Sequence, residues 1–349
     1  MSNRFLDLLA NNNGPIIADG GMGTMLMAVG LLFGDPPEQW NVLPEKQAHI
    51  RAIHRGYLDA GAQIILTNSF GGSPFRLKLH NLHSQVFELN RAAAELARAE
   101  AGDRVVAGDI GPSGELFEPM GALTYDTAVA GFAAQAAGLA AGGVDLLWIE
   151  TMSDLNEVRA AVAGARQAAP NLPVVATMTF DTRGFTMMGV SPADAVAALA
   201  ELGLAAGGGN CGNGPDEIEG VIHGMRVALE SRNASRGSPT PNSQLPTPAF
   251  PLIAKSNAGM PEIVDGRAVY SGTPEVMAEY ARRVRALGAD IIGACCGSTP
   301  DHIRAMAHAL RELPALSLDE VALASAPAQR QAPGAAQRAR EERRARRGA

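Results

Sequence analysis

The sequence predicts an α/β fold in which eight parallel strands and their following helices form one closed (β/α)8 barrel. Three observations indicate this fold. Eight short runs rich in apolar residues alternate along the chain with segments of helical spacing. Each run is almost continuously apolar, which is typical of strands buried on both faces of a parallel sheet. Eight such units in about 300 residues favour a closed barrel over an open doubly wound sheet, although an open sheet can also hold eight strands.

The predicted strands follow one another at intervals that leave room for a helix between them. They comprise residues 15–18, 63–66, 104–107, 145–149, 173–178, 204–208, 251–254 and 290–294. Helical spacing between them predicts helices at residues 84–101, 127–144, 153–168, 192–202 and 273–287. Ser153 and Thr273 are predicted N-caps, and Pro192 lies at a helix start, where a missing N–H is tolerated.

Two segments interrupt the pattern of strands and helices. Residues 231–250 are rich in Ser, Pro and Asn, which predicts a flexible loop between the sixth helix and the seventh strand. From about Ala322 the chain is rich in Ala, Pro, Gln and Arg, and we expect a disordered basic tail over residues 316–349. A single domain, residues 1–315, is therefore expected to form the barrel.

The composition is that of an ordinary soluble globular protein. Hydrophobic residues make up 46% of the 349 residues and charged residues 19%, which excludes collagen, coiled coil and wholesale disorder. The net charge is −7, and the last twenty residues contribute +5, so residues 1–329 carry −12. Because the body is acidic, we expect no nucleic acid as a partner.

The chain is expected to reside in a reducing, cytoplasmic compartment. The most apolar long segment, residues 127–144, contains Gln135 and has amphipathic spacing, so no membrane segment is predicted. The N-terminus lacks a basic region followed by an apolar one, so we expect no signal peptide. Three cysteines, two of them adjacent, cannot form the disulfide framework of a secreted protein. The sequence leaves the oligomeric state open.

Polar or Gly-rich sequence follows every predicted strand, at the end of the barrel where enzymes of this fold carry their active sites. All three cysteines lie there, Cys211 after the sixth strand and Cys295 and Cys296 after the eighth. Since only the seventh strand separates these two ends, the thiols can converge on one zinc ion. Buried cysteines that merely fill the core remain the alternative, because this spacing is a weaker signal than paired Cys-x-x-Cys motifs.

A zinc ion with three thiolate ligands favours sulfur chemistry. Three negative charges make the ion a poor activator of water. A substrate thiol in the open fourth position is held as the thiolate, which is the nucleophilic form. The predicted ligand set therefore favours alkylation of sulfur over hydrolysis.

Other strand ends carry candidate substrate-binding residues. Glu150 ends a buried strand, where it could receive a substrate ammonium group or form a salt bridge to a neighbouring Lys or Arg. The turn of Asp19, Gly20 and Gly21 offers backbone N–H groups to a carboxylate, or is only a tight turn between strand and helix. Trp40 and Phe70 could bind a quaternary ammonium by cation–π contact, although ordinary packing is the more frequent role of such aromatics.

Motifs of other enzyme classes are missing from the sequence. The chain has no Gly-x-Gly-x-x-Gly fingerprint, no Walker loop and no recognisable Ser–His–Asp arrangement. An oxidoreductase with a nucleotide cofactor is therefore disfavoured. A non-catalytic zinc or thiol sensor remains an alternative to an enzyme.

Five motifs at the predicted strand ends occur in a characteristic order. They are Asp19-Gly20-Gly21-Met22-Gly23-Thr24, Thr67-Asn68-Ser69-Phe70-Gly71, Gly108-Asp109-Ile110-Gly111-Pro112-Ser113-Gly114-Glu115, Asn210-Cys211-Gly212 and Gly293-Ala294-Cys295-Cys296-Gly297. Together they resemble the zinc-dependent homocysteine S-methyltransferase family, over about residues 15–313. The resemblance implies a TIM barrel with zinc on Cys211, Cys295 and Cys296, and homocysteine sulfur as an exchangeable zinc ligand.

The resemblance also implies roles for other residues. Glu150 takes the amino group of homocysteine, and the turn of Asp19, Gly20 and Gly21 takes its carboxylate. Asn257 matches an Asn that fills the fourth zinc position when substrate is absent.

The methyl donor is also inferred from the resemblance, which is closest to bacterial betaine–homocysteine methyltransferases. It implies transfer from glycine betaine to homocysteine, giving dimethylglycine and methionine. Trp40 and Phe70 match donor-site aromatics, while Gly71 stands where animal betaine enzymes have a second aromatic. S-methylmethionine, another sulfonium compound, or a separate methylcorrinoid protein is the alternative donor.

Overall fold

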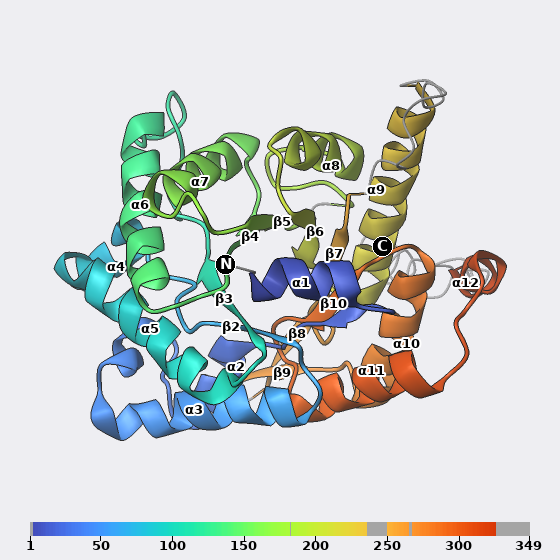
Figure 1. Cartoon of the computed structure of the whole chain (residues 1–349), viewed down its shortest axis with the longest axis horizontal. Helices are drawn as coiled ribbons and strands as arrows, with labels where there is room; N and C mark the ends of the chain where they lie inside the picture. Colours follow the sequence, from blue (N-terminus) through green and yellow to red (C-terminus); the bar gives the residue numbers. More distant parts are fainter. Residues whose placement is uncertain (1–2, 182, 236–249, 265–266, 326–349) are drawn as a thin grey trace, which may run out of the picture. The chain divides into compact units, whose positions relative to one another are not determined.

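The computed structural model, which describes residues 3–181, 183–235, 250–264 and 267–325, contains an eight-stranded parallel sheet (Figure 1). Its strand order is β1-β10-β7-β6-β5-β4-β3-β2. The strands are β1 Ile16–Ile17, β2 Ile64–Leu66, β3 Val105–Ile110, β4 Leu146–Met152, β5 Val174–Met178, β6 Ala206–Cys211, β7 Leu252–Ser256 and β10 Ile291–Ala294. A parallel bridge between Ala18 and Ile64 joins the edge strands β1 and β2. The predicted (β/α)8 barrel is confirmed.

Helices lie between successive strands and cover the outside of the barrel (Figure 1). The helices of this part of the chain are α1 Arg4–Asn11, α2 Met22–Ala28, α3 Pro44–Asp59, α4 Pro74–Lys78, α5 Val86–Ala101, α6 Tyr125–Ala141, α7 Leu155–Ala168, α8 Pro192–Glu201, α9 Pro215–Ser235, α10 Pro274–Ala286 and α11 Pro300–Glu312, with the short 3-10 helices η1 Pro37–Asn41 and η2 His83–Gln85. The five predicted helices correspond to α5, α6, α7, α8 and α10.

Helix starts agree with the sequence predictions at two of three positions. The Thr273 side chain caps α10, and Pro192 is the first residue of α8, as predicted. The prediction for Ser153 is wrong, because α7 begins at Leu155 and its N-cap is Asp154. The Asp154 carboxylate accepts a hydrogen bond from the Asn156 N–H at 2.7 Å, which satisfies a backbone donor of the first turn.

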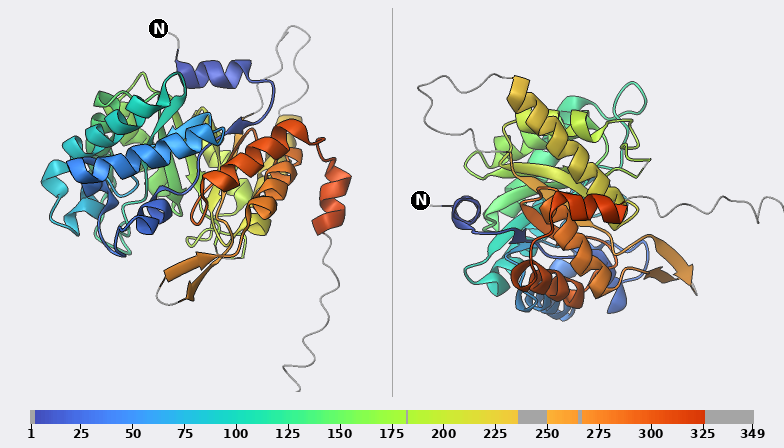
Figure 2. Two further views of the ribbon diagram at one scale, coloured as in Figure 1. Left: turned by 90° about the horizontal axis from the view of Figure 1, so that it is seen from below. Right: turned by 90° about the vertical axis from the view of Figure 1, so that its right-hand side faces the viewer.

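The barrel interior is apolar along most of its length. Residues of every barrel strand belong to one buried cluster, which includes the alternate residues Val105 and Ala107 of β3 and Leu146 and Trp148 of β4. Phe5 of α1 belongs to the same cluster, so α1 covers the N-terminal end of the barrel. Figure 2 shows α1 at that end of the strands.

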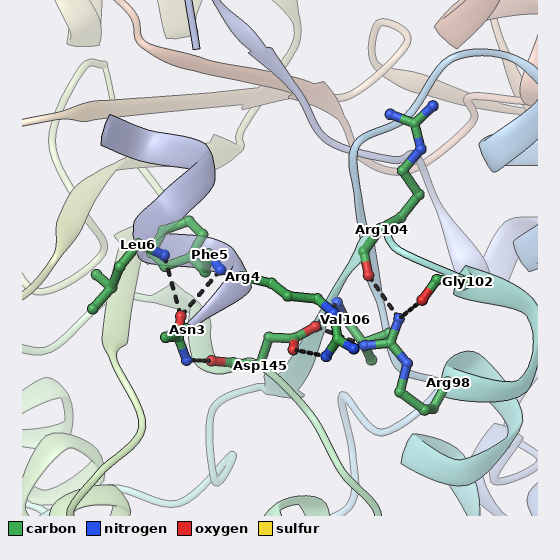
Figure 3. A network of polar contacts seen from close by, with 9 residues as sticks. All are labelled: Asn3, Arg4, Phe5, Leu6, Arg98, Gly102, Arg104, Val106 and Asp145. Atoms are coloured by element: carbon green, nitrogen blue, oxygen red, sulfur yellow. Dashed lines mark hydrogen bonds and ion pairs between the residues drawn. The ribbon is translucent and has the colours of Figure 1, made fainter. Parts of the chain in front are cut away.

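A polar network fixes α1 to the barrel (Figure 3). The Asp145 carboxylate accepts hydrogen bonds from Arg4 Nη1 at 3.0 Å and from Arg98 Nη1 at 2.8 Å. It also accepts one from the Val106 N–H at 2.8 Å, while Asn3 Nδ2 donates to the Asp145 carbonyl at 2.8 Å. The residue before β4 therefore joins α1, α5 and β3.

Between β7 and α10 the chain forms an antiparallel hairpin that the sequence analysis did not predict. Its strands are β8 Pro261–Val264 and β9 Arg267–Tyr270. The hairpin projects at the end of the barrel opposite α1 (Figure 2). It follows the carboxyl end of β7 and therefore belongs to the face where active sites of this fold lie.

The predicted flexible loop at residues 231–250 needs a correction. Residues 231–235 are the last residues of α9, and the Ser231 hydroxyl donates to the Val227 carbonyl at 2.9 Å within that helix. Ser and Asn favour loops, but here the hydrogen bonding of α9 continues through them. Residues 236–249 lie outside the described residues.

The described chain divides after Ala315 into two compact units. The second contains α12 Leu318–Ser325, so the expected disorder over residues 316–349 is wrong for this segment. Ser317 and Glu320 explain the helix start: Ser317 N–H and Oγ each donate to Glu320 Oε2 at 2.8 Å, and the Glu320 N–H donates to Ser317 Oγ. This reciprocal capping stabilises a helix N-terminus. Residues 326–349 lie outside the described part.

Within the described residues, none of the helices has both the length and the hydropathy that a membrane span requires.

Candidate active site

A cavity of about 200 Å³ lies at the carboxyl ends of the strands. It brings together most of the predicted site residues, namely Asp19, Gly20, Gly21, Phe70, Glu150, Cys211, Cys295 and Cys296. Trp40 and Asn257 do not line it. The predicted convergence of distant strand ends on one place is therefore present in the fold.

The three cysteines meet beside this cavity. Cys211 is the last residue of β6, and Cys295 and Cys296 directly follow β10. Ser256 of β7 pairs with Cys211 on one side and with Ala294 on the other, so β7 alone separates the two thiol-bearing ends. The three Sγ atoms all lie within 4.8 Å of one another.

Local backbone conformation helps to bring the thiols together. Cys211 has a φ of 65° and Gly212 a φ of 67°, so the chain turns sharply at the end of β6. Gly297, with a φ of 79°, turns it after the other two cysteines. Such φ values favour glycine, and Cys211 holds one without being a glycine, which marks a locally constrained residue.

Crowding makes the thiols hard to ionise by themselves. A contact with the Cys295 thiol lowers the pKa of Cys211, but a contact with Cys296 and burial outweigh it and raise this pKa to about 12. A contact with Cys211 and burial also raise the pKa of Cys295. A bound cation would offset this, since metal ligation by cysteine requires the thiolate.

Asn257 lies next to the thiols and braces the loops that carry them. Its Nδ2 is 3.5 Å from Cys211 Sγ and donates to the Gly212 carbonyl at 2.7 Å. Its Oδ1 accepts a hydrogen bond from the Cys296 N–H at 3.0 Å. In this arrangement the carboxamide oxygen already has a partner, and the role of Asn257 as a fourth zinc ligand stays a prediction.

The floor of the cavity is a buried cluster of charged side chains. Lys255 Nζ lies 3.3 Å from Asp19 Oδ1 and 3.8 Å from Glu150 Oε2. Burial lowers the pKa of Lys255, but the two carboxylates outweigh burial and hold it above its usual value. Burial raises the pKa of Glu150 against the opposing effect of Lys255. The salt bridge weighed as an alternative role for Glu150 is therefore present.

The ion pair does not satisfy the Glu150 carboxylate. Oε2 of Glu150 is buried and makes no hydrogen bond within the described part of the chain. Because an unsatisfied buried oxygen costs free energy, this atom has room for a further donor from a ligand. The salt bridge and the ammonium-binding role are thus compatible.

The turn of Asp19, Gly20 and Gly21 is packed tightly against the loop that carries two of the cysteines. A Cβ at Gly20 would lie 2.4 Å from Ser298 Oγ, and one at Gly21 would lie 2.8 Å from the Cys295 carbonyl oxygen. The Gly21 N–H already donates to Ser298 Oγ at 3.0 Å. Close packing therefore requires these glycines, and the carboxylate-binding role of the turn stays a prediction.

The two predicted donor-site aromatics lie in different surroundings. Phe70 is 36% exposed and lines the cavity. Trp40 is 6% exposed, and its ring lies 5.8 Å from that of His49 with Lys46 Nζ 4.5 Å from its centroid. Trp40 thus already has a cation from its own chain on its ring and does not reach the cavity wall.

Contact with Glu38 explains why position 71, which follows Phe70, is a glycine. The buried Glu38 accepts a hydrogen bond from the Gly71 N–H at 2.6 Å. A Cβ at Gly71 would lie 2.9 Å from Glu38 Oε1. The carboxylate therefore occupies the space that a side chain at this position would need.

Two charged residues of the cavity, Lys255 and Asp109, were not predicted as site residues from the sequence. The signal was available in the strand alternation. Ile253 and Ala107 belong to the interior cluster, so the residues two positions further on also face the interior. A charged residue at an inward position beyond an apolar one marks the polar end of the barrel.

A second cavity, of about 550 Å³, lies near the N-terminal ends of the strands. Its polar lining residues include Asn12, Gln63, Arg104, Arg285 and Arg311. No cysteine or carboxylate side chain is among the described residues that line it. The cavity that the three cysteines line is therefore the candidate active site, although it is smaller than this one.

Known proteins are similar to this chain in both sequence and fold. Residues 16–310 match the homocysteine S-methyltransferase family. Methionine synthases of Mycobacterium tuberculosis and Mycobacterium leprae are 31% identical over 88% and 84% of this chain, which spans 25% and 24% of their length. Crystal structures of the homocysteine methyltransferase MmuM from Escherichia coli, oxidized and metallated, align with a TM-score of 0.68 and 25% identity, over 87% of this chain and 99% of theirs.

Proposed function

The chain belongs to the homocysteine S-methyltransferase family, whose reaction converts homocysteine to methionine, and we propose that it uses zinc and takes the methyl group from glycine betaine. The observation that carries the proposal is the cluster of three thiols beside a cavity with a charged, buried floor. A thiol substrate bound there has its sulfur near the cysteines and its polar groups near Glu150 and Lys255.

The geometry of the cysteines fits zinc. Tetrahedral coordination with Zn–S distances of about 2.3 Å places sulfur atoms about 3.8 Å apart. The Sγ atoms of Cys211, Cys295 and Cys296 lie within 4.8 Å of one another, so small side-chain rotations suffice. When bound there, zinc supplies the positive charge that keeps a substrate thiol ionised at neutral pH.

Residues of the cavity bind and orient the acceptor. Glu150 receives the ammonium group of homocysteine, and the turn of Asp19, Gly20 and Gly21 receives its carboxylate. Lys255 holds Asp19 and Glu150 in place through its two ion pairs. These contacts fix the sulfur in line with the donor methyl group, and burial of the floor excludes water. Methyl transfer from an onium donor to a thiolate moves no proton, so no general base is required.

Glycine betaine is the favoured donor because an aromatic ring lines the cavity. Phe70 lines the cavity, and a quaternary ammonium against its ring gains a cation–π contact of about 2 kcal/mol when water is excluded. S-methylmethionine, whose sulfonium also carries a positive charge, and a separate methylcorrinoid protein are the alternative donors. Free thiols at three clustered cysteines are stable in a reducing compartment, so we place the reaction in the cytoplasm.

The test is methionine formation by reduced, zinc-loaded protein with homocysteine and methyl-deuterated glycine betaine, read by mass spectrometry. Deuterated methionine supports both the reaction and the donor. Methionine formed only from S-methylmethionine, in a parallel reaction, overturns the donor and leaves the acceptor half intact. Zinc and homocysteine binding without turnover on any donor, methylcobalamin included, contradicts the enzymatic role and favours a thiol sensor.

A further inference from the structure

Asp109 occupies an inward position at the end of β3 that none of the roles above uses. Val105 and Ala107 of the same strand belong to the interior cluster, so Asp109 is the next residue on that face. It pairs in register with Trp148 of the neighbouring strand β4, and Glu150 lies two residues beyond Trp148. Asp109 and Glu150 are therefore diagonal neighbours on the inner face of the barrel.

The main chain of Asp109 is held firmly, whereas its carboxylate is not. The Asp109 N–H donates to Thr67 Oγ1 at 2.9 Å, and its carbonyl accepts from Ser69 Oγ at 2.8 Å. The residue is 6% exposed and lines the active-site cavity. Its Oδ1 is buried without a hydrogen-bond partner in the described part of the chain.

The charges of the cavity floor do not balance. Three carboxylates, Asp19, Asp109 and Glu150, line the cavity together with one ammonium group, that of Lys255. Lys255 lies within ion-pair distance of Asp19 and Glu150. Burial, followed by the negative charge of Glu150, raises the pKa of Asp109 well above its usual value. A buried carboxylate without a partner destabilises a protein, so this one is better explained by a cationic ligand.

We propose that Asp109 and Glu150 together form the receptor for the α-ammonium group of the substrate. This inference rests on the proposed function, because it assigns the amino group of homocysteine to a pair of carboxylates rather than to Glu150 alone. Lys255 acts as a positioning residue that fixes Asp19 and Glu150. The ammonium supplies the positive charge that the floor lacks and a donor for each unpartnered oxygen.

The test compares two thiols that differ only in the amino group. Calorimetry measures the dissociation constants of homocysteine and of 4-mercaptobutanoate for the zinc-loaded Asp109→Asn variant and for the zinc-loaded unaltered protein. We expect the variant to bind homocysteine about ten- to a hundredfold more weakly, as for the loss of a hydrogen bond to a charged group. Its affinity for 4-mercaptobutanoate should stay within about twofold, because that ligand has no ammonium group for the carboxylate to bind.

Equal weakening for both thiols overturns the proposal, because Asp109 would then act on the carboxylate or on the fold. Unchanged homocysteine affinity overturns it as well. Glu157→Gln, which alters a buried carboxylate outside the cavity, is the matched control and should leave both affinities unchanged.

Thermal unfolding gives a second readout on the same variant. Asp109→Asn should melt at the same temperature as the unaltered protein or higher, because the carboxyl group that it replaces is buried and its Oδ1 has no hydrogen-bond partner to lose. A large fall in melting temperature contradicts the inference, since it means that the carboxylate already has a stabilising partner. Selective binding of homocysteine without turnover supports the receptor and refutes the proposed reaction, so the two hypotheses fail separately.

Discussion

Lys255 balances two of the buried charges that line the cavity. Its Nζ is 3.3 Å from Asp19 and 3.8 Å from Glu150, and its side chain is almost completely buried. Its ammonium group also lies 5.3 Å from the centroid of the Trp148 ring. Removing the ammonium group therefore leaves two carboxylates buried without their counter-ion.

Lys255→Met should lower the free energy of unfolding by about 3–5 kcal/mol, which is typical of breaking a buried ion pair on one side. Urea unfolding followed by circular dichroism measures the change. Lys78→Met, at an exposed position of α4, is the control and should differ by less than about 0.5 kcal/mol. A loss below about 1 kcal/mol at Lys255 would mean that the carboxylates protonate and tolerate its removal.

His54 of α3 is a buried titratable side chain, and it makes the stability of the fold depend on pH. It is completely buried, and neither ring nitrogen has a hydrogen-bond partner among the described residues. Burial lowers the pKa of His54 to about 4, although the charge of Glu100 opposes this effect. The folded protein therefore keeps the imidazole neutral at pH values where the unfolded chain protonates it.

Because the unfolded state binds more protons between about pH 6.5 and about pH 4, the contribution of His54 to stability is present above that range and is lost as the pH falls through it. Between about pH 7 and about pH 5 the loss is about 2 kcal/mol. His54→Leu should lack this component. The stability of the variant relative to that of the unaltered protein should therefore increase as the pH falls. Chemical unfolding of both proteins at several pH values measures the difference, and parallel profiles would refute the assignment.

At the scale of elements, α1 depends on a network centred on Asp145. The carboxylate accepts hydrogen bonds from Arg4 of α1, Arg98 of α5 and the Val106 N–H of β3 (Figure 3). The side chain of Phe5, from the same helix, packs in the interior cluster. The N-terminal helix is thus part of the barrel and covers the end opposite the cysteines.

Asp145→Asn should destabilise the protein by about 2 kcal/mol, because the amide keeps the shape but loses the charge that two guanidinium groups share. Amide hydrogen exchange should show the largest increase in α1, since that helix loses one of its fixed contacts. Asp103→Asn, whose side chain is 98% exposed, is the control and should change neither quantity. Uniform exchange across the barrel would instead indicate a global loss of stability without a special role for α1.

Across the whole molecule, strand periodicity and chain order explain why the barrel and the thiol cluster could be predicted from the sequence. The convergence of Cys211 with Cys295 and Cys296 results from the order of the last three barrel strands, since a closed parallel barrel brings their carboxyl ends together. The burial of Glu150 results in the same way from its place at the end of an apolar run.

Residue contacts that depend on packing between distant segments could not be predicted from the sequence patterns. The position of Trp40 depends on how η1 lies against α3, where Lys46 and His49 cover its ring. The pairing of Lys255 with Asp19 joins residues 236 positions apart, and no local signal specifies it. The hairpin β8–β9 and the capping of α12 by Ser317 were not predicted for a different reason, because short elements produce weak periodicity.

The barrel core and the thiol cluster should respond differently to removal of the metal. The interior cluster, which contains Trp148 and Ile253, is apolar and includes none of the cysteines, so we expect the fold to form without an ion. A chelator applied to reduced, zinc-loaded protein should therefore leave the far-ultraviolet circular dichroism spectrum unchanged. It should abolish methyl transfer and allow a thiol reagent to modify Cys211, Cys295 and Cys296, which the bound ion otherwise protects.

Restoring zinc before modification should restore both activity and protection, whereas oxidation of the metal-free protein should link Cys211 to a cysteine of the other loop and prevent reloading. Unfolding on chelation would show that the metal is structural.

Cys296→Ala should retain the fold and lose turnover even at saturating zinc, because the remaining two thiolates no longer form the proposed site. Turnover retained by Cys296→Ala would show that the methyl transfer does not depend on the three-thiolate site.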